Sequence, residues 1–387
     1  MAVDWAELPP ELLQTIAEKL TIHIDYIRFR AVCVNWRSSS PNTPHHLPCQ
    51  LPWLMLPQCR THQTHSHGFF RLSANKVHFL NLPEASHHRR RCGSSHGWLV
   101  ILDESPAVFL LNPLTRAMVH LPPLSAFPNV VDFNFYDVGR EYSLRATNGD
   151  TYTCNLKDMR DSFIKKVILS SSPSSSHNYI ALAILNQIGD LAFRKNGEQS
   201  WRFIENSQSY CEDVIYWNGL FYAVNKFGEI AVCDVHGPSP RVSIIGTPRQ
   251  IGGDIQYLVS SSEELLLVTR YLDEFNDDQP DIMFRTMQFR VYRLDLSGPK
   301  WDRVTSLGDR MLFLGENSSL ALSAPDFPGC KGNCIYYTDD YAESNYDGIS
   351  GDHDLGVYNL EDGSIESLPC YPRNSNSAPI WVTPNPY

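Results

Sequence analysis

Two stretches decide the fold: residues 179–204 (YIALAILNQIGDLAFRKNGEQSWRFI) and residues 211–235 (CEDVIYWNGLFYAVNKFGEIAVCDV). Each follows one order: an apolar strand, a glycine-containing turn, a second apolar strand, a second such turn and an outer strand. The same order recurs, with long insertions, in residues 264–304 and 334–368, and Trp201 and Trp301 open the last strand of their units. Such repetition predicts that each unit forms one sheet.

Four Asn-Gly or Asp-Gly dipeptides separate strand-like runs, at positions 148–149, 196–197, 218–219 and 362–363. This dipeptide favours a two-residue type I′ hairpin, because both of its residues tolerate positive φ. No amphipathic stretch of helix length stands between the strands, which argues against parallel βαβ units. We therefore expect a mainly β chain built as an antiparallel meander.

Residues 1–42 have a different pattern and predict three short helices. Pro9 and Pro10 suit a helix start, and Asp25 is a candidate N-cap for the second helix. Apolar residues recur three to four positions apart at Leu12, Leu13, Ile16 and Leu20, and a further cluster comprises Val32, Cys33 and Trp36. A segment this small buries little core by itself. It is either a cap on the β domain or a module whose core is completed by a partner.

The head also resembles a known family. The patterns W-x-x-LP-x-x-LL-x-x-I-x-x-x-L and R-x-R-AVC-x-x-WRS, from Trp5 to Ser38, look like an F-box, the motif that docks substrate receptors on the Skp-type adaptor of cullin ubiquitin ligases. The connector TIHIDYI departs mildly from the family pattern. The resemblance implies that the adaptor is bound by Leu8, Pro9, Leu12, Ile16, Val32 and Trp36.

Residues 68–387 resemble a kelch-like β-propeller, of the kind found in a plant F-box family whose propeller was long catalogued as a domain of unknown function. About 320 residues at roughly 40–50 per blade imply six or seven blades. The expected organisation is a three-helix F-box at residues 1–42, a linker at 43–67 and an irregular propeller at 68–387.

The expected linker, residues 43–67, is rich in proline and histidine. Its Cys49, Cys59, His62, His65 and His67 suggest zinc, but their spacing fits no common finger. Cys330 and Cys334 are one residue too far apart for a Cys-x-x-Cys pair. A polar linker explains the first set of residues better, and a tight turn explains Cys330 and Cys334 equally well. We expect neither a metal nor another cofactor.

Composition and charge narrow the classes of protein to which this chain can belong. The net charge is −11, residues 41–100 carry +5, and HHRRR (87–91) is the only basic run, so nucleic-acid binding is not expected. The sequence has neither an 18-residue apolar stretch nor the pattern of a signal peptide. Ten dispersed cysteines suggest reduced thiols, and hence the nucleus or the cytoplasm.

Two acidic insertions, within residues 271–281 and 339–354, are candidates for target recognition. Carboxylates raise the encounter rate with a basic protein surface, and interleaved aromatic rings supply desolvated contacts. Solvated loops are the alternative, and the spacing for a calcium loop is absent. The candidate residues are Tyr271, Asp273, Glu274, Phe275, Asp277, Asp278, Asp339, Asp340, Tyr341 and Tyr346.

Three functional hypotheses follow. The resemblance implies a non-catalytic receptor that recruits a target protein for ubiquitination and degradation by a Skp–cullin–F-box (SCF) ligase. A non-degradative binder that sequesters a kinase or a transcription factor is the alternative. A propeller enzyme is disfavoured, because the sequence lacks the serine-hydrolase elbow, the phosphate loop and the zincin motif.

Overall fold

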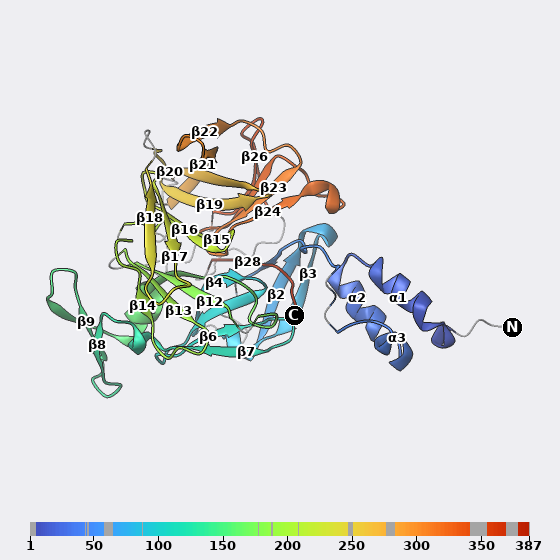
Figure 1. Cartoon of the computed structure of the whole chain (residues 1–387), viewed down its shortest axis with the longest axis horizontal. Helices are drawn as coiled ribbons and strands as arrows, with labels where there is room; N and C mark the ends of the chain where they lie inside the picture. Colours follow the sequence, from blue (N-terminus) through green and yellow to red (C-terminus); the bar gives the residue numbers. More distant parts are fainter. Residues whose placement is uncertain are drawn as a thin grey trace.

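The computed structural model describes residues 5–42, 44, 46–57, 65–86, 88–176, 178–186, 189–207, 209–246, 251–275, 283–340, 354–368 and 378–386. A small helical head lies to one side of a much larger body of β-sheets (Figure 1). The mainly β architecture with an α-helical head is therefore confirmed.

The head contains a 3₁₀ turn, η1 (Trp5–Glu7), and helices α1 (Pro10–Glu18), α2 (His23–Arg30) and α3 (Val34–Ser38). Helix α1 begins at Pro10, as expected. A backbone N–H at the first helical position has no intrahelical acceptor, so a proline, which lacks this N–H, loses no hydrogen bond there. The expected cap on α2 is wrong. The residue before α2 is Ile22, no side chain caps the helix, and Asp25 lies in the first turn, where it pairs with Arg28 at 3.2 Å.

The core of the head is formed by Leu13, Ala17, Tyr26 and Phe29, all buried. Leu8, Leu20, Trp36 and Leu47 pack partly against it. Four buried side chains form a very small core, so much of the apolar surface of the helices stays uncovered.

Among the described residues, the strands form seven sheets. In spatial order, the first sheet contains β28 (Ile380–Val382), β1 (Trp53–Met55), β2 (Ser66–Arg71) and β3 (Lys76–Asn81). The second contains β4 (Arg90–Ser95), β5 (Trp98–Leu102), β6 (Val108–Leu111) and β7 (Met118–Leu121). The third contains β11 (Ile164–Leu169), β12 (Ile180–Leu185), β13 (Leu191–Lys195) and β14 (Arg202–Phe203).

The fourth sheet contains β15 (Asp213–Trp217), β16 (Leu220–Val224), β17 (Ile230–Asp234) and β18 (Arg241–Ile245). The fifth contains β19 (Ile255–Ser261), β20 (Glu264–Phe275), β21 (Met283–Asp295) and β22 (Lys300–Val304). The sixth contains β24 (Leu320–Ser323), β23 (Arg310–Leu314), β25 (Cys334–Tyr337), β26 (Gly356–Asn359) and β27 (Ile365–Glu366).

These six sheets form a ring, as in a β-propeller. Their inner strands β28, β4, β11, β15, β19 and β24 contact one another in that order. The ring closes where Phe313 of β23 meets Trp381 of β28, with ring centroids 5.2 Å apart. A three-stranded sheet of β8 (Val130–Phe133), β9 (Tyr142–Arg145) and β10 (Thr151–Cys154) stands off from the ring (Figure 1).

Short helical turns occur in the connections between the strands. They are η2 (Leu72–Ala74), η3 (Pro83–Ala85), η4 (Leu124–Ala126), α4 (Leu156–Asp158), the π-helical turn η5 (Met159–Phe163) and η6 (Ala324–Asp326).

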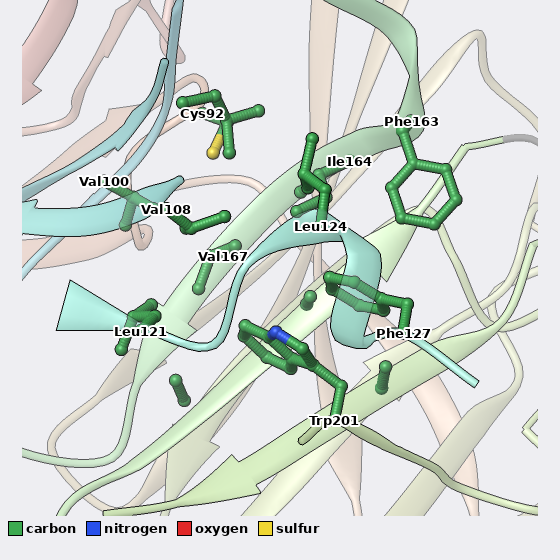
Figure 2. Packing of buried hydrophobic residues seen from close by; sticks show 14 of the residues in the cluster. Cys92, Val100, Val108, Leu121, Leu124, Phe127, Phe163, Ile164, Val167 and Trp201 are labelled. Carbon is green, nitrogen blue, oxygen red and sulfur yellow. The ribbon is translucent and has the colours of Figure 1, made fainter. Parts of the chain in front are cut away.

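Each of the four repeat units predicted from the sequence lies within one sheet, from the third to the sixth of the ring, but covers only three of its strands. The units contain β12–β14, β15–β17, β20–β22 and β25–β27. Trp201 and Trp301 have equivalent roles. The indole of Trp201 donates to the carbonyl of Pro122 at 3.0 Å, and that of Trp301 donates to the carbonyl of Gly228 at 2.7 Å. Trp201 also stacks on Phe127, 4.7 Å away, between the second and third sheets (Figure 2). These tryptophans therefore join neighbouring sheets.

The predicted turns are only partly of the expected type. Asn218 and Gly219 both have positive φ, of 47° and 83°, and connect β15 to β16 as a type I′ hairpin. At 148–149, 196–197 and 362–363 only the glycine has positive φ, so these turns are of another type. His96 and Gly97, which are neither an Asn-Gly nor an Asp-Gly pair, form another two-residue turn of this kind between β4 and β5, with φ of 53° and 86°.

The sixth sheet departs from the predicted antiparallel meander. Strands β23 and β25 are parallel neighbours, with Met311 opposite Cys334. The chain turns from β23 into β24, which pairs antiparallel with β23 on its inner side, and then returns to add β25 on the outer side.

The predicted linker is wrong in part, because residues 53–55 form strand β1. This strand pairs with β2 on one side and with β28 on the other. Residues 66 and 67 already belong to β2, so the first sheet includes residues that precede the expected start of the propeller at residue 68. Cys59 and His62 lie outside the described residues, and no metal-binding group of His, Cys, Asp or Glu occurs in the described part of the chain.

Candidate interaction surfaces

Several apolar side chains of the head are exposed. Leu12, Ile16 and Val32 are 53%, 40% and 57% exposed. In α1, Leu13 and Ala17 point into the core of the head, so Leu12 and Ile16, which precede them, lie on the outward face. Pro9 is exposed at the start of the same helix. We call Pro9, Leu12, Ile16 and Val32 the head stripe.

The other two expected adaptor residues differ from the head stripe. Leu8 and Trp36 are half-buried and pack against the core of the head. The Trp36 ring lies 4.6 Å from that of Phe29, and its indole donates to the carbonyl of Trp5 at 2.9 Å. These two residues therefore stabilise the head and leave only part of their surface for a partner. Trp5 is 65% exposed, so its ring enlarges the apolar surface.

Polar contacts connect the head to the following segment. Gln50 accepts a hydrogen bond from the backbone N–H of His23 at 3.0 Å, and its amide donates to the carbonyl of Thr21 at 3.0 Å. The His46 Nε2 atom lies 3.0 Å from the carbonyl oxygen of Ala17. Residues 46–50 thus lie against the head and lead directly into β1.

The first acidic insertion extends a hairpin. Strands β20 and β21 have 12 and 13 residues, longer than any other described strand of the ring. Tyr271 is half-buried; its hydroxyl donates to the carbonyl of Gly252 at 3.0 Å, and the Arg290 guanidinium lies 4.5 Å from its ring centre. Asp273 is exposed, and Glu274 and Phe275 end β20. Asp277 and Asp278 lie outside the described residues.

The second insertion corrects the prediction for Asp339 and Asp340. Asp339 is 7% exposed, and the Asp340 carboxylate pairs with the fully buried Arg270 at 3.0 Å. These carboxylates are consequently not free to contact a target. A run of charges is usually solvated, but Arg270 lies 70 residues away in sequence, so no local pattern could reveal the pairing. Tyr341 and Tyr346 lie outside the described residues.

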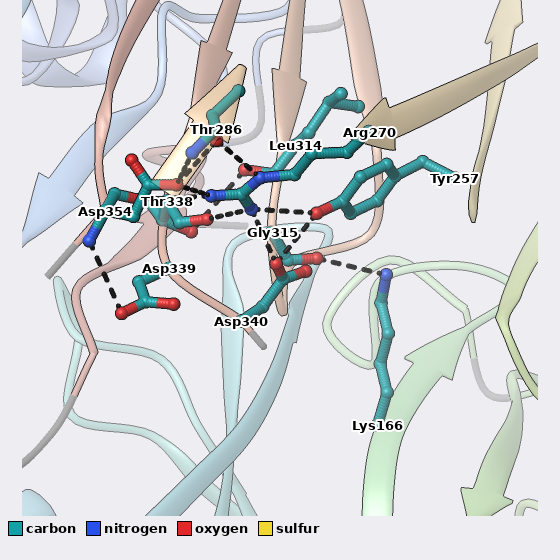
Figure 3. Close-up of polar contacts among 10 residues, drawn as sticks. All are labelled: Lys166, Tyr257, Arg270, Thr286, Leu314, Gly315, Thr338, Asp339, Asp340 and Asp354. Carbon is teal, nitrogen blue, oxygen red and sulfur yellow. Dashed lines mark hydrogen bonds and ion pairs between the residues drawn. The ribbon is translucent and has the colours of Figure 1, made fainter. Parts of the chain in front are cut away.

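Arg270 is the centre of a buried polar network that sequence reasoning missed (Figure 3). Its Nη1 atom also donates to the Thr338 carbonyl at 3.0 Å and to the Tyr257 hydroxyl at 3.1 Å. Its Nη2 atom donates to Asp354 Oδ2 at 2.8 Å, and its Nε atom donates to Thr286 Oγ1 at 2.8 Å. The guanidinium lies 4.8 Å from the ring centre of Tyr337. An arginine within the apolar run ELLLVTRYL was the available signal, because a buried charge requires partners.

The electrostatics of this network identify a structural ion pair. Burial raises the pKa of the Asp340 carboxyl, and the Arg270 charge opposes that rise. Burial alone would lower the pKa of Arg270, but Tyr257, Asp354 and Asp340 outweigh it and raise the pKa. Arg270 on β20 thus bonds to Thr286 on β21 and to Asp340 and Asp354, which flank the second insertion. The two insertions therefore arise side by side on neighbouring sheets.

A second buried pair connects other sheets of the ring. Lys166 of β11 lies 2.7 Å from Asp213 of β15, and both side chains are buried. The other Asp213 oxygen accepts from the Leu258 backbone N–H of β19 at 2.9 Å. Like the Arg270 network, this pair holds neighbouring sheets together.

Among the described helices, none is long and apolar enough to cross a membrane.

Comparison with known proteins identifies the family. Residues 69–359 match the model of the KIB1-4 beta-propeller. The chain belongs to the KIB1-4 β-propeller family. Its match to F-box protein SKIP23 of Arabidopsis thaliana has 30% identity and covers 98% of this chain and 96% of the relative. Its match to the putative F-box protein At5g55150 of the same plant has 28% identity and covers 98% and 97%.

The family assignment and these relatives confirm the resemblance to plant F-box proteins that carry a propeller. The KIB1-4 match begins after the head, whereas both relatives align with nearly the whole chain. The KIB1-4 propeller of this chain is therefore joined to its head in the same overall arrangement as in proteins named for an F-box.

Proposed function

We propose that this chain is the target-recognition subunit of an SCF-type ubiquitin ligase. In this function the head binds a Skp-type adaptor, and through it a cullin, while the propeller binds the target protein. The names of its relatives support the F-box assignment. The observation that carries the proposal is the head stripe, which is exposed on a module too small to bury it.

The energetic reason is the hydrophobic effect. Burial of a leucine, isoleucine or valine side chain is worth about 1.5–3 kcal/mol. Leu12, Ile16 and Val32 gain only about half of this in the isolated chain, since they are 53%, 40% and 57% exposed. A helical partner that covers the head stripe would recover the rest. The half-buried Leu8 and Trp36 would lie at the edge of that interface.

For the target, we propose the end of the ring that carries the long β20–β21 hairpin. Tyr271 and Asp273 belong to this hairpin, and further carboxylates follow within the same insertion. The target would present a basic surface. Charge would set the rate at which the two proteins meet, and the aromatic contacts would set the lifetime of their complex. Asp339 and Asp340 are left out of this surface because they are buried.

The mechanism would be positioning. Holding a target lysine beside a ubiquitin-loaded enzyme raises their effective concentration, which can lower a barrier by several kcal/mol. We assign no acid, base or nucleophile to this chain.

The test is the affinity of the full chain for a purified Skp-type adaptor, measured by calorimetry. The double substitution Leu12→Asp, Ile16→Asp should weaken binding at least 100-fold, because it places two charges in an apolar interface. Phe79→Asp, on the outer part of the propeller and 70% exposed in the parent chain, is the matched control and should leave affinity unchanged. Equal affinity of the double variant, with an unchanged melting temperature, would overturn the proposal.

A further inference from the structure

The three-stranded sheet that stands off from the ring carries an exposed apolar tip. We call residues 130–154, which contain β8, β9 and β10, the arm. Its tip consists of Phe135, Tyr136 and Val138, in the turn between β8 and β9, and these side chains are 55%, 88% and 90% exposed. The function proposed above does not use them. Exposed apolar side chains that gather in one place mark interaction sites, whereas single ones are common on any surface.

Hydrogen bonds hold the turn that carries the tip. The backbone N–H of Asn134 donates to the Glu141 carbonyl at 2.8 Å, and that of Tyr136 donates to Asn134 Oδ1 at 3.1 Å. Glu141 is 6% exposed, and its carboxylate accepts from the backbone N–H groups of Gly139 at 3.0 Å and Leu156 at 3.2 Å. The turn is therefore ordered in the free chain, which lowers the entropic cost of binding a partner.

The apolar area of the tip limits the kind of complex that it can form. The Phe135 and Tyr136 rings lie edge to face, with centroids 6.2 Å apart. Since an aromatic side chain has about 150–250 Å² of surface to bury, the three side chains of the tip offer on the order of 400 Å². Two tips in contact, with the polar residues around them, would bury on the order of 1,000 Å² in total, which is near the lower limit for a specific interface. Such a complex is weak.

The charges beside the tip indicate which partner fits it. Asp132, Asp137, Arg140 and Arg145 are exposed, and their side chains have neither a hydrogen bond nor an ion pair within the described part of the chain. Two acids and two bases favour neither a strongly basic nor a strongly acidic partner. A second copy of the arm is complementary to this set, because a two-fold axis places the acids of each copy opposite the bases of the other.

We propose that the arm is a self-association surface, through which two copies of this chain form a weak homodimer with their tips in contact. Direct pairing of the two β8 edges is disfavoured. The register of β8 shifts between Val130 and Asp132, and such a bulge disturbs the ladder of an edge strand. The contact is therefore made by side chains of the tip, with Asp137 of each copy beside Arg140 of the other.

The position of the arm makes this dimer compatible with a partner on the head. Figure 1 shows the arm and the helical head on opposite sides of the ring. A dimer joined by its arms would leave both head stripes exposed and would hold two heads in one complex, which raises the avidity for any bivalent partner. The inference does not rest on the proposed function, since the oligomeric state is measured without an adaptor or a target.

The experiment is sedimentation equilibrium of the full chain alone, from about 1 to about 200 μM. The mean mass should rise toward twice that of one chain, with a dissociation constant on the order of 10–100 μM, as a small interface implies. Tyr136→Asp should raise this constant at least tenfold, because it replaces the exposed ring with a charge. Leu296→Asp adds the same charge at a 57% exposed position in the turn after β21, and this matched control should dimerise as the parent does.

Two outcomes would overturn the proposal. One is the mass of a single chain at every concentration. The other is a Tyr136→Asp variant that keeps the melting temperature of the parent and dimerises equally well, because the contact would then lie elsewhere.

A pair of charge reversals tests the two-fold arrangement. Asp137→Arg and Arg140→Asp each place like charges opposite each other, so each variant alone should dimerise at least tenfold more weakly than the parent. An equimolar mixture should regain the dimer, since one copy then supplies only bases and the other only acids at these two positions. A mixture that associates no better than either variant alone would contradict the proposed contact.

Discussion

At the scale of single residues, the fold depends on charges that lie inside it. Arg270 is 1% exposed, and its guanidinium bonds to two carboxylates, a tyrosine hydroxyl, a threonine and a backbone carbonyl. A buried ion pair need not be stabilising compared with apolar residues of similar size, but the loss of one partner leaves an uncompensated charge. Arg270 is therefore sensitive to substitution.

The substitution Arg270→Met tests this directly. It keeps most of the side-chain volume but leaves Asp340 and Asp354 without their cation, and should lower the free energy of unfolding by about 3–5 kcal/mol. Arg241→Met is the control, because Arg241 pairs with Asp234 while its side chain is 80% exposed, and should cost under about 1 kcal/mol. Urea unfolding of both variants measures the two losses in free energy of unfolding. Equal losses would show that the buried Arg270 network stabilises the fold no more than an exposed ion pair does.

His67 gives the fold a dependence on pH. Burial, aided by the charge of Arg91, lowers its pKa to about 4. The unfolded chain, with an ordinary pKa of about 6.5, takes up a proton first as the pH falls, so stability is full above about 6.5 and is lost toward 4. Between pH 7 and pH 5 this loss should be on the order of 2 kcal/mol.

The check is the shift of the urea midpoint between pH 7 and pH 5 in the parent chain and in His67→Leu. The variant should lose less stability on acidification than the parent. The exposed His120→Leu should behave as the parent does. If His67→Leu loses as much as the parent, the pH dependence comes from other groups.

At the scale of elements, two hairpin glycines allow two energetic costs to be compared. One is the cost of a positive φ, and the other is the cost of a steric clash with a neighbouring segment. Gly97 and Gly219 both have positive φ, of 86° and 83°. An added Cβ at Gly97 would lie 2.6 Å from Asn385 Cβ and 2.9 Å from the Thr383 carbonyl oxygen, whereas at Gly219 nothing lies within 4 Å. Gly219→Ala should cost about 1–2 kcal/mol, from backbone conformation alone. Gly97→Ala should cost more, because the C-terminal segment must also move.

Thermal unfolding of the two alanine variants under the same conditions measures the contrast. A larger fall of the melting temperature for Gly97→Ala is the expected result. Equal falls would mean that residues 383–385 move aside without cost.

The elements also show what sequence reasoning can reach. The repeat units predicted the sheets, because strand, turn and strand are neighbours in the chain and their signals are local. Strand β1 was not predicted, since three residues in a proline-rich segment become a strand by pairing with β2 and with β28, which lies more than 300 residues away. The residues of the head stripe were among those that the resemblance to an F-box implied, whereas helical spacing alone grouped Leu12 and Ile16 with the buried Leu13. Asp339 and Asp340 were misassigned because their burial depends on contacts distant in sequence, such as the contact of Asp340 with Arg270, 70 residues away.

At the scale of the whole molecule, the ring is closed by the C-terminal strand. Strand β28 pairs with β1, and its Trp381 is buried against Phe313 of the sixth sheet. Truncation after residue 377 should therefore open the ring and abolish cooperative unfolding, whereas removal of Tyr387 alone should not. A peptide of residues 378–386 added to the truncated chain should restore part of the folding transition in calorimetry. A truncated chain that melts like the parent would show that closure is dispensable.

In the proposed function, the head binds the adaptor while the propeller stays free for a target. Hydrogen–deuterium exchange of the full chain, with and without a saturating Skp-type adaptor, tests it most directly. We predict protection in α1 and in residues 31–38, with no change in β20 and β21. Protection confined to the propeller strands, or none anywhere in the head of a chain shown to bind, would contradict the account.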